Sequence, residues 1–328
     1  MVGEMTLDSS QEEEFRRINR AFGSVYRPGK LSIGLVVPLE AYPGGPVPHM
    51  DRHLSRAQLA ERLGFAALWL RDVPFNVPSF GDAGQVFDPF TYLGFLAGQT
   101  KRIALGVASV ILPLRHPAHV AKAAASADVL SDGRLLLGIA SGDRPDEYPA
   151  MNIDYASRAE RFRHSVDYIR NVATPYASFV SEHGAPDGID LLPKPHGGRL
   201  PLLVTGGSRQ HPDWVAQHGD GWITYPRNVP AQEQAVQDYR ARLAGLGEPD
   251  KPVTQSLYID VVDDENCAPQ PIHLGFRAGI KALLAHLKGL EAAGINHVAL
   301  NLRLNRADTE ATMKRLAEHV LPAFSNGA

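Results

Sequence analysis

Thr205-Gly-Gly-Ser208 combines residue types that suit the binding of a phosphate group. The segment follows a short apolar run, expected to be a buried strand, and precedes a helical pattern. Gly206 and Gly207 can adopt backbone conformations closed to other residues, and N–H groups exposed at the start of a helix attract anions. We expect Ser208 to cap that helix and a phosphate monoester to bind at the turn. The alternative is a tight turn that binds no ligand.

A second candidate for phosphate binding is Arg158, which has Arg161 and Arg163 close by. An arginine offers two parallel donors to phosphate oxygens. Basic side chains at the start of a helix oppose the helix dipole, so a nearby anion would account for them. The alternative is a solvated charged face in which these arginines pair with Glu160.

Arg71 and Asp72 directly follow a predicted strand and are the first candidates for catalytic contacts with a substrate or with oxygen. His116 and Arg144 also follow predicted strands and are expected to face the same site. A structural interpretation stands beside each: Arg71 and Asp72 can form an ion pair, and His116 can cap the helix after it.

Other patterns are weaker indications of a binding or catalytic site. The small residues of Ala108-Ser109-Val110 end a predicted strand and would let a flat ring lie against the backbone, although ordinary strand packing gives the same pattern. The pairs His49/His53 and His116/His119 have spacings found among metal ligands, but no third ligand is clustered with either pair, so we expect no metal site. Dinucleotide, P-loop and nucleophile-elbow fingerprints are absent.

Alternating apolar runs and helical patterns must position these residues. Strands are expected at 31–37, 66–70, 103–110, 135–140, 202–205, 221–225, 256–262 and 297–302, and helices at 52–63, 89–99, 117–130, 159–172, 212–218, 232–243, 277–293 and 309–321. Uniformly apolar strands separated by helices predict an α/β fold with a parallel sheet covered on both faces. Eight such units favour a closed (β/α)₈ TIM barrel. An open doubly wound sheet is the alternative.

We expect a single domain over residues 1–328, with an N-terminal appendage at 1–30. An insertion after the fourth strand, at 142–199, is expected to lie over the barrel mouth, because long connections of this kind are usually functional. Ser10 and Glu13 form a capping-box pattern that predicts a helix in the appendage. Apolar residues then recur at helical spacing, at Phe15, Ile18 and Phe22.

Composition points to a small-molecule partner. The chain has a net charge of -3 and is 44% hydrophobic, so it offers no basic stripe for nucleic acid or for a membrane surface. A single cysteine, Cys267, excludes an intrachain disulfide. Residues 1–22 lack the apolar segment of a secretion signal, and no apolar run suits a bilayer span. We expect a cytoplasmic protein.

Four segments form an ordered set: AERLGFAALWLRD at 60–72, GVASVILPLRHP at 106–117, SDGRLLLGIASG at 131–142 and HGDGWI at 218–223. Each motif alone is weak. Together they resemble the bacterial-luciferase-like flavin monooxygenases and luciferase-type oxidoreductases, over nearly the whole chain from about Leu31 to Ala323.

The resemblance implies a TIM-like barrel that holds FMN, or the deazaflavin F420 in one branch. It implies a non-proline cis peptide at Ala108–Ser109 under the flavin ring. It aligns Arg158 with an arginine that binds the flavin phosphate, and Thr205–Ser208 with the backbone turn around that phosphate. The remaining flavin-binding candidates in the shared motifs are Val110, Ser141 and Gly142.

Two departures from luciferase concern the chemistry. Arg71-Asp72 stands where luciferase has a catalytic histidine, and Ala140 stands where it has a reactive cysteine. Light emission driven by an aldehyde is therefore not expected.

The combined expectation is an FMN-dependent monooxygenase or oxidoreductase that uses O₂ on a small organic substrate, inside a barrel that keeps water away. A separate NAD(P)H:flavin reductase is the expected partner, and a homodimer is the expected assembly. The alternatives are an F420-dependent reductase or dehydrogenase of the same superfamily, and a non-catalytic flavin-binding protein on the same fold.

Overall fold

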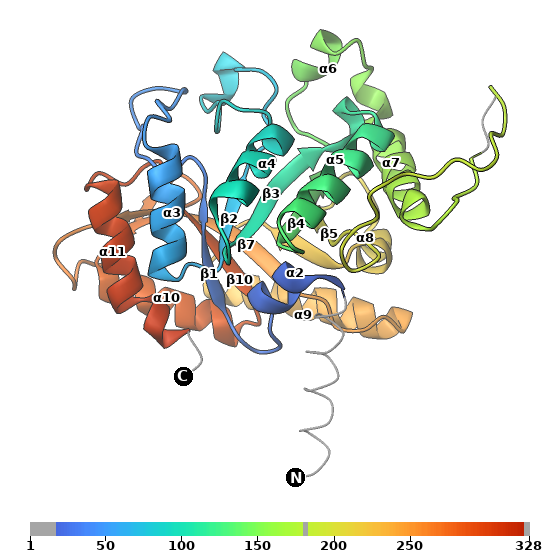
Figure 1. The fold of residues 1–328 in the computed structure, drawn as a ribbon. Coiled ribbons are helices and arrows are strands. Elements are labelled where there is room, and N and C mark those ends of the chain that lie inside the picture. Colours follow the sequence, from blue (N-terminus) through green and yellow to red (C-terminus); the bar gives the residue numbers. More distant parts are fainter. Residues whose placement is uncertain (1–17, 180–182, 325–328) are drawn as a thin grey trace.

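Eight parallel strands close into a barrel at the centre of the structure (Figure 1). The computed structural model describes residues 18–179 and 183–324. The last barrel strand pairs with both the seventh and the first, which closes the ring and excludes an open doubly wound sheet. The strands are β1 (Ser32–Val36), β2 (Ala67–Leu70), β3 (Ala104–Ile111), β4 (Leu135–Ala140), β5 (Leu202–Thr205), β6 (Gly221–Thr224), β7 (Val253–Val261) and β10 (His297–Asn301). The predicted (β/α)₈ barrel is confirmed.

Helices follow the barrel strands and cover the outside of the barrel (Figure 1). They are α3 (His53–Leu63), α4 (Pro89–Gln99), α5 (Pro117–Leu130), α7 (Arg158–Ala173), α8 (Pro212–His218), α9 (Val229–Leu246), α10 (Ile280–Ala292) and α11 (Thr309–His319). Short 3₁₀ turns lie at η1 (Pro78–Phe80), η2 (Leu112–Leu114) and η4 (Leu321–Ala323). Strand and helix side chains share one outer core. Within the described ranges, no helix is both long and apolar enough to cross a bilayer.

A hairpin of β8 (Gln270–Ile272) and β9 (Gly275–Ala278) lies between β7 and α10. The sequence patterns predict a helix from residue 277, and this is wrong for its first three residues, because β9 pairs in parallel with β7. A Cβ atom at Gly275 would come within 1.8 Å of the carbonyl oxygen of Tyr258. Glycine therefore permits a close pairing of distant segments, which leaves no local periodicity to detect.

The predicted insertion at 142–199 divides into parts with different positions. Its first part holds α6 (Glu147–Ala150) and η3 (Tyr155–Ser157) and lies at the mouth of the barrel. Its last part packs along the outside: the Lys194 ammonium donates to the carbonyl of Val172 (3.0 Å), and the His196 N–H donates to Asp128 (2.8 Å). Among the described residues of this insertion, those that line the cavity at the mouth lie in the segment before α7 and at the first residue of α7.

The N-terminal appendage closes the bottom of the barrel with α2 (Arg20–Val25). Ser10, Glu13 and Phe15, on which the predicted appended helix depends, lie outside the described residues. A helix continuous through Ile18 and Phe22 is wrong, because Asn19 is extended and its side chain caps α2 by accepting from the Phe22 N–H. The aromatic rings of α2 and its C-cap then pack into the inner core of the barrel.

Polar side chains inside the barrel form a hydrogen-bonded chain. Trp69 Nε1 donates to Nε2 of His297 over 2.8 Å, and Nδ1 of His297 lies 2.6 Å from the hydroxyl of Ser32. Because Nε2 accepts, the ring proton lies on Nδ1 and is donated to Ser32. Burial lowers the pKa of His297 to about 3, so the imidazole is neutral at physiological pH. The Ser32 hydroxyl passes the chain on to the carbonyl of Val25.

Replacement of Trp69 by phenylalanine should lower the free energy of unfolding by roughly 1–3 kcal/mol, because Nε2 of His297 would be buried without a donor. Urea denaturation at neutral pH measures this. The double variant Trp69→Phe/His297→Leu should lose less than the sum of the two single losses. Strict additivity would show that this hydrogen bond does not contribute.

Candidate active site

A cavity of about 790 Å³ opens at the carboxyl ends of the barrel strands. Its floor consists of inner-core side chains, among them Val36, Trp69 and Ala299. Most of the sequence-predicted site residues line it: Arg71, Asp72, Ala108, Ser109, Ser141, Gly142, Arg158, Thr205, Gly206, Gly207 and Ser208. Val110 and His116 do not line it; Val110 is fully buried behind the strand end.

The predicted phosphate turn leaves β5 and runs along the cavity wall. Gly206 has φ 54°, and Ser208 and Arg209 also have positive φ, at 42° and 62°. The prediction that Ser208 caps α8 is wrong, because its hydroxyl donates back to the carbonyl of Thr205 (2.8 Å) and His211 is the N-cap. The turn is longer than the strand-to-helix junction that the sequence predicts.

This conformation leaves backbone donors without acceptors. The Gly206 N–H donates to Ile223 and the Gln210 N–H to Gly207, each over 2.8 Å. The three N–H groups between them, of residues 207–209, have no acceptor in the part of the chain that the structure describes. Consecutive free N–H groups in a turn form a concave site for an anion.

Arg158 begins α7 beside the same wall of the cavity. Its Nη1 donates to the carbonyl of Tyr155 (2.7 Å), and its guanidinium lies 3.6 Å from the centre of the Tyr155 ring. Its Nε is buried and has no partner among the described residues. Of the neighbouring arginines, Arg161 donates to Pro113 outside the cavity and Arg163 is exposed. Arg158 thus lines the same cavity as the turn and has one donor that no described group satisfies.

The end of β3 forms a second wall. The Ala108–Ser109 peptide is cis, as the family resemblance implies, and the β3–β4 register shifts between Val107 and Val110. The Ser109 hydroxyl is hydrogen-bonded to the hydroxyl of Thr205, which ties this wall to the phosphate turn. The side chains here are small, so a planar group can lie close to the backbone.

Arg71 and Asp72 both reach the cavity, but they do not pair with each other. Asp72 accepts from Nε and Nη2 of Arg115 (2.9 and 2.7 Å) and from the N–H of Ile111 (3.0 Å). These contacts use most of its acceptor capacity. Arg71 instead donates to Asp82 at 2.5 Å. The alternative interpretation, in which Arg71 and Asp72 form an ion pair, is therefore wrong.

His116 lies away from the cavity and faces a groove beside α7. Its Nδ1 accepts from the N–H of Ala118 (3.2 Å), so it caps α5 as the structural interpretation predicts. His119 is its ring neighbour. Among the described residues, no three His, Cys, Asp or Glu side chains gather as a metal-ligand set.

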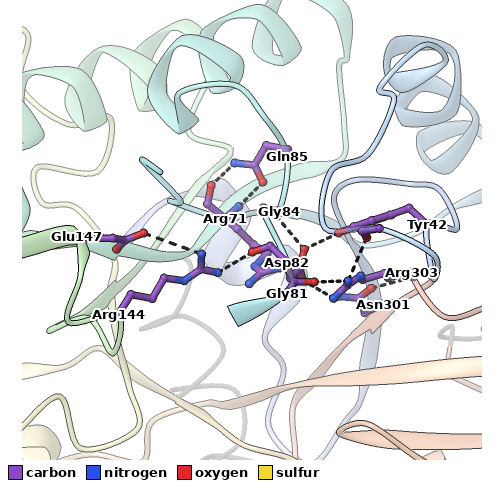
Figure 2. Close-up of polar contacts among 11 residues, drawn as sticks. Tyr42, Arg71, Gly81, Asp82, Gly84, Gln85, Arg144, Glu147, Asn301 and Arg303 are labelled. Atoms are coloured by element: carbon purple, nitrogen blue, oxygen red, sulfur yellow. Dashed lines mark hydrogen bonds and ion pairs between the residues drawn. The ribbon is translucent and has the colours of Figure 1, made fainter. Parts of the chain in front are cut away.

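Asp82, which sequence reasoning misses, organises the opposite side of the mouth (Figure 2). Its carboxylate accepts from Arg71, from the Tyr42 hydroxyl (2.9 Å) and from the Gly84 N–H (2.9 Å), and it lies 3.2 Å from Nη1 of Arg303. Burial raises the pKa of Asp82, but the two arginines and the N–H donor outweigh burial and lower it. The carboxylate is therefore ionised at neutral pH.

Arg144 and Glu147 approach Asp82 from the loop after β4 (Figure 2). Glu147 is 2% exposed, and Arg144 Nη1 lies 4.0 Å from its Oε1, too far for a hydrogen bond. Burial raises the pKa of Glu147 from 4.5 to about 7, although Arg144 opposes the shift. Sequence reasoning also misses Arg303, although its position just after the eighth strand is a signal that could have identified it as a residue of the mouth. Asp82 and Glu147 lie in loops and have no such signal.

Glu147→Gln should stabilise the protein at pH 8 relative to the wild type, by roughly 1–3 kcal/mol. Between pH 4.5 and 7 the folded wild type holds a proton that the unfolded chain has lost, so wild-type stability falls as pH rises through this window. The variant lacks this slope. Urea denaturation from pH 4.5 to 8 tests it, and parallel curves for the two proteins would contradict the assigned ionisation.

The luciferase-like monooxygenase family model matches residues 31–322, and the chain belongs to this family of monooxygenases and oxidoreductases. The F420-dependent hydroxymycolic acid dehydrogenase of Mycobacterium tuberculosis is 28% identical over 258 residues, which cover 77% of this chain and 69% of that protein.

The oxygenase component of the flavin-dependent trigonelline monooxygenase of Acinetobacter baylyi is 34% identical over 124 residues, or 37% of this chain and 33% of that protein. A solved monooxygenase structure from Streptomyces bottropensis aligns with a TM-score of 0.75 at 19% identity, over 90% of this chain and 100% of that chain. This structural likeness shows the shared barrel fold.

Proposed function

We propose that this chain binds FMN at the barrel mouth and oxygenates a small organic substrate, with electrons supplied by a separate reductase. The observation that supports this best is the group of free donors on one side of the mouth. It consists of the N–H groups of residues 207–209 and Nε of Arg158. These donors fit one phosphate monoester, which is the charged group of FMN.

The residues of the mouth would act mainly by position. The turn after β5 and Arg158 would hold the phosphate, and the small side chains at Ala108 and Ser109 would leave room for the ring. When bound, FMN would supply the redox chemistry with O₂. The barrel walls and the loop that carries Arg144 would limit the access of water to the reacting atoms.

Arg158→Ala should weaken FMN binding by about 1.5–3 kcal/mol, the range for a hydrogen bond to a charged group. Riboflavin lacks the phosphate, so its affinity should be lower in the wild type and unchanged by the substitution. Calorimetric titration of both ligands measures this. Arg163→Ala, which removes an exposed arginine from the same helix, is the control and should bind FMN normally. Equal wild-type affinities for FMN and riboflavin would overturn the phosphate assignment.

Electrons should reach the flavin from outside this chain. The sequence has no dinucleotide fingerprint, and the similar Acinetobacter baylyi protein is named as an oxygenase component. In anaerobic stopped-flow mixing of the FMN-loaded protein with NADH or NADPH, bleaching should be slow or absent, and an added flavin reductase should restore it. Direct bleaching at roughly 1–10³ per second, the typical range of enzyme turnover, would contradict the two-component scheme.

F420-dependent dehydrogenation is the second candidate, because the similar Mycobacterium tuberculosis protein is named F420-dependent and matches over 77% of this chain. Arg209 lines the mouth next to the phosphate turn and would suit a longer acidic tail. A parallel titration with F420 separates the candidates. Affinity for F420 roughly tenfold above that for FMN would favour the dehydrogenase.

A further inference from the structure

Arg144 is a buried cation without a carboxylate at hydrogen-bond distance. The residue is 7% exposed, and its Nη1 has no hydrogen-bond partner among the described residues. Its Nη2 donates to the main-chain carbonyl of Asp82 (3.0 Å), and its guanidinium lies 4.8 Å from the centre of the Phe80 ring. Its nearest carboxylate is that of Glu147, 4.0 Å from Nη1. A buried charge without a hydrogen-bonded counter-ion is costly, so this arrangement is suited to an incoming anion.

The surrounding charges leave a positive excess. Arg71, Arg144 and Arg303 line the cavity together, and the carboxylate of Asp82 forms ion pairs with Arg71 and Arg303. The pKa of Glu147 lies at about 7, so this carboxyl group does not give Arg144 a full counter-charge. Asp82 and Asp143 line the cavity with the three arginines, so one positive charge is left when Glu147 is protonated. One further negative charge would then balance the cluster.

The hydrogen bonds already made by the three arginines show which of them have donors left for an added negative charge. Arg303 contacts Asp82 through Nη1 and the carbonyls of Gly45 and Gly81 through Nη2, and its Nε is buried without a partner among the described residues. Both of its Nη atoms are thus already engaged. Arg71 uses Nη1 for Asp82, and its Nε and Nη2 make no hydrogen bond within the described part of the chain. Arg71 and Arg144 therefore each retain a donor without a partner, and both residues line the same cavity. Figure 2 shows that both side chains approach Asp82.

We propose that the mouth recognises an organic substrate through a carboxylate, held by the free donors of Arg144 and Arg71. The proposal rests on the proposed function, because it names the substrate class for the same mouth. Arginine donors match the two oxygens of a carboxylate in a planar arrangement. Phe80, Tyr225 and Leu274 line the cavity and are each at least 40% exposed, so the rest of the substrate would contact aromatic and aliphatic side chains.

The carboxylate site is separate from the proposed phosphate site. Arg71 and Arg303 follow β2 and β10, the two neighbours of β1, whereas the phosphate turn follows β5. Arg144 follows β4, which is beside β5, but its Nη2 donates to the main-chain carbonyl of Asp82, whose carboxylate binds Arg71 and Arg303. In the closed ring, β5 is four strands from β1 in either direction. A cofactor whose phosphate is bound after β5 would therefore leave the arginine cluster to the second reactant.

The test uses benzoate as the probe and benzamide as its uncharged counterpart, titrated calorimetrically into the full chain with and without FMN. Wild-type protein should bind benzoate roughly tenfold or more tightly than benzamide, as expected for a charge-assisted pair. Arg144→Gln should abolish this preference and keep FMN affinity, whereas Arg158→Ala should lose FMN affinity and keep the preference. Arg62→Gln removes an exposed arginine of α3 and should leave both unchanged.

Equal binding of benzoate and benzamide, or a preference that survives in Arg144→Gln, would overturn the carboxylate site. If circular dichroism shows Arg144→Gln to be unfolded, Arg144→Lys replaces it and should reduce the preference by roughly threefold or more, because an ammonium cannot make the paired contact. An unchanged preference in that variant overturns the site. Benzoate preference without FMN binding would overturn the proposed cofactor and support the carboxylate site.

Discussion

Pairing between the first and last strands of the barrel is the constraint on which the rest of the structure depends. Four positions join them in parallel, from Ser32 with His297 to Leu35 with Leu300. Because all eight strands are parallel, closing the ring brings their carboxyl ends to one rim, where loops from every part of the chain meet. Arg71 and Arg303 can share Asp82 only because β10 and β2 both flank β1.

Asp82 shows how a single buried carboxylate can organise a rim built from distant loops. It connects the loop after β1 through Tyr42, the segment after β2 through Arg71, and the segment after β10 through Arg303. The main-chain carbonyl of the same residue holds Arg144 from the loop after β4. Removal of one partner would leave the others with an uncompensated buried charge, so the contacts of the cluster depend on one another.

The predictable part of the fold and site is the part that local patterns encode. The eight strands follow from short apolar runs, and the turn after β5 follows from two glycines between a strand and a helix. Asp82 and Glu147 were not predicted, because an acidic residue in a loop looks the same whether it is solvated or buried against an arginine. The β8–β9 hairpin was missed for a related reason, since its pairing with β7 depends on a contact at Gly275 that no local periodicity reports.

Sequence alone determined the alternation of strand and helix, the presence of eight such units and the residue types at the strand ends, because hydrophobic periodicity is a local property. The tertiary structure decided the partners. In the folded chain, Asp72 binds Arg115 and Arg71 binds Asp82. His116 caps α5 outside the cavity, and Arg144 is buried with one donor that has no partner among the described residues. These outcomes depend on which loops meet once the barrel closes. Desolvation then sets the charge of each group, and neither effect can be read from neighbours along the chain.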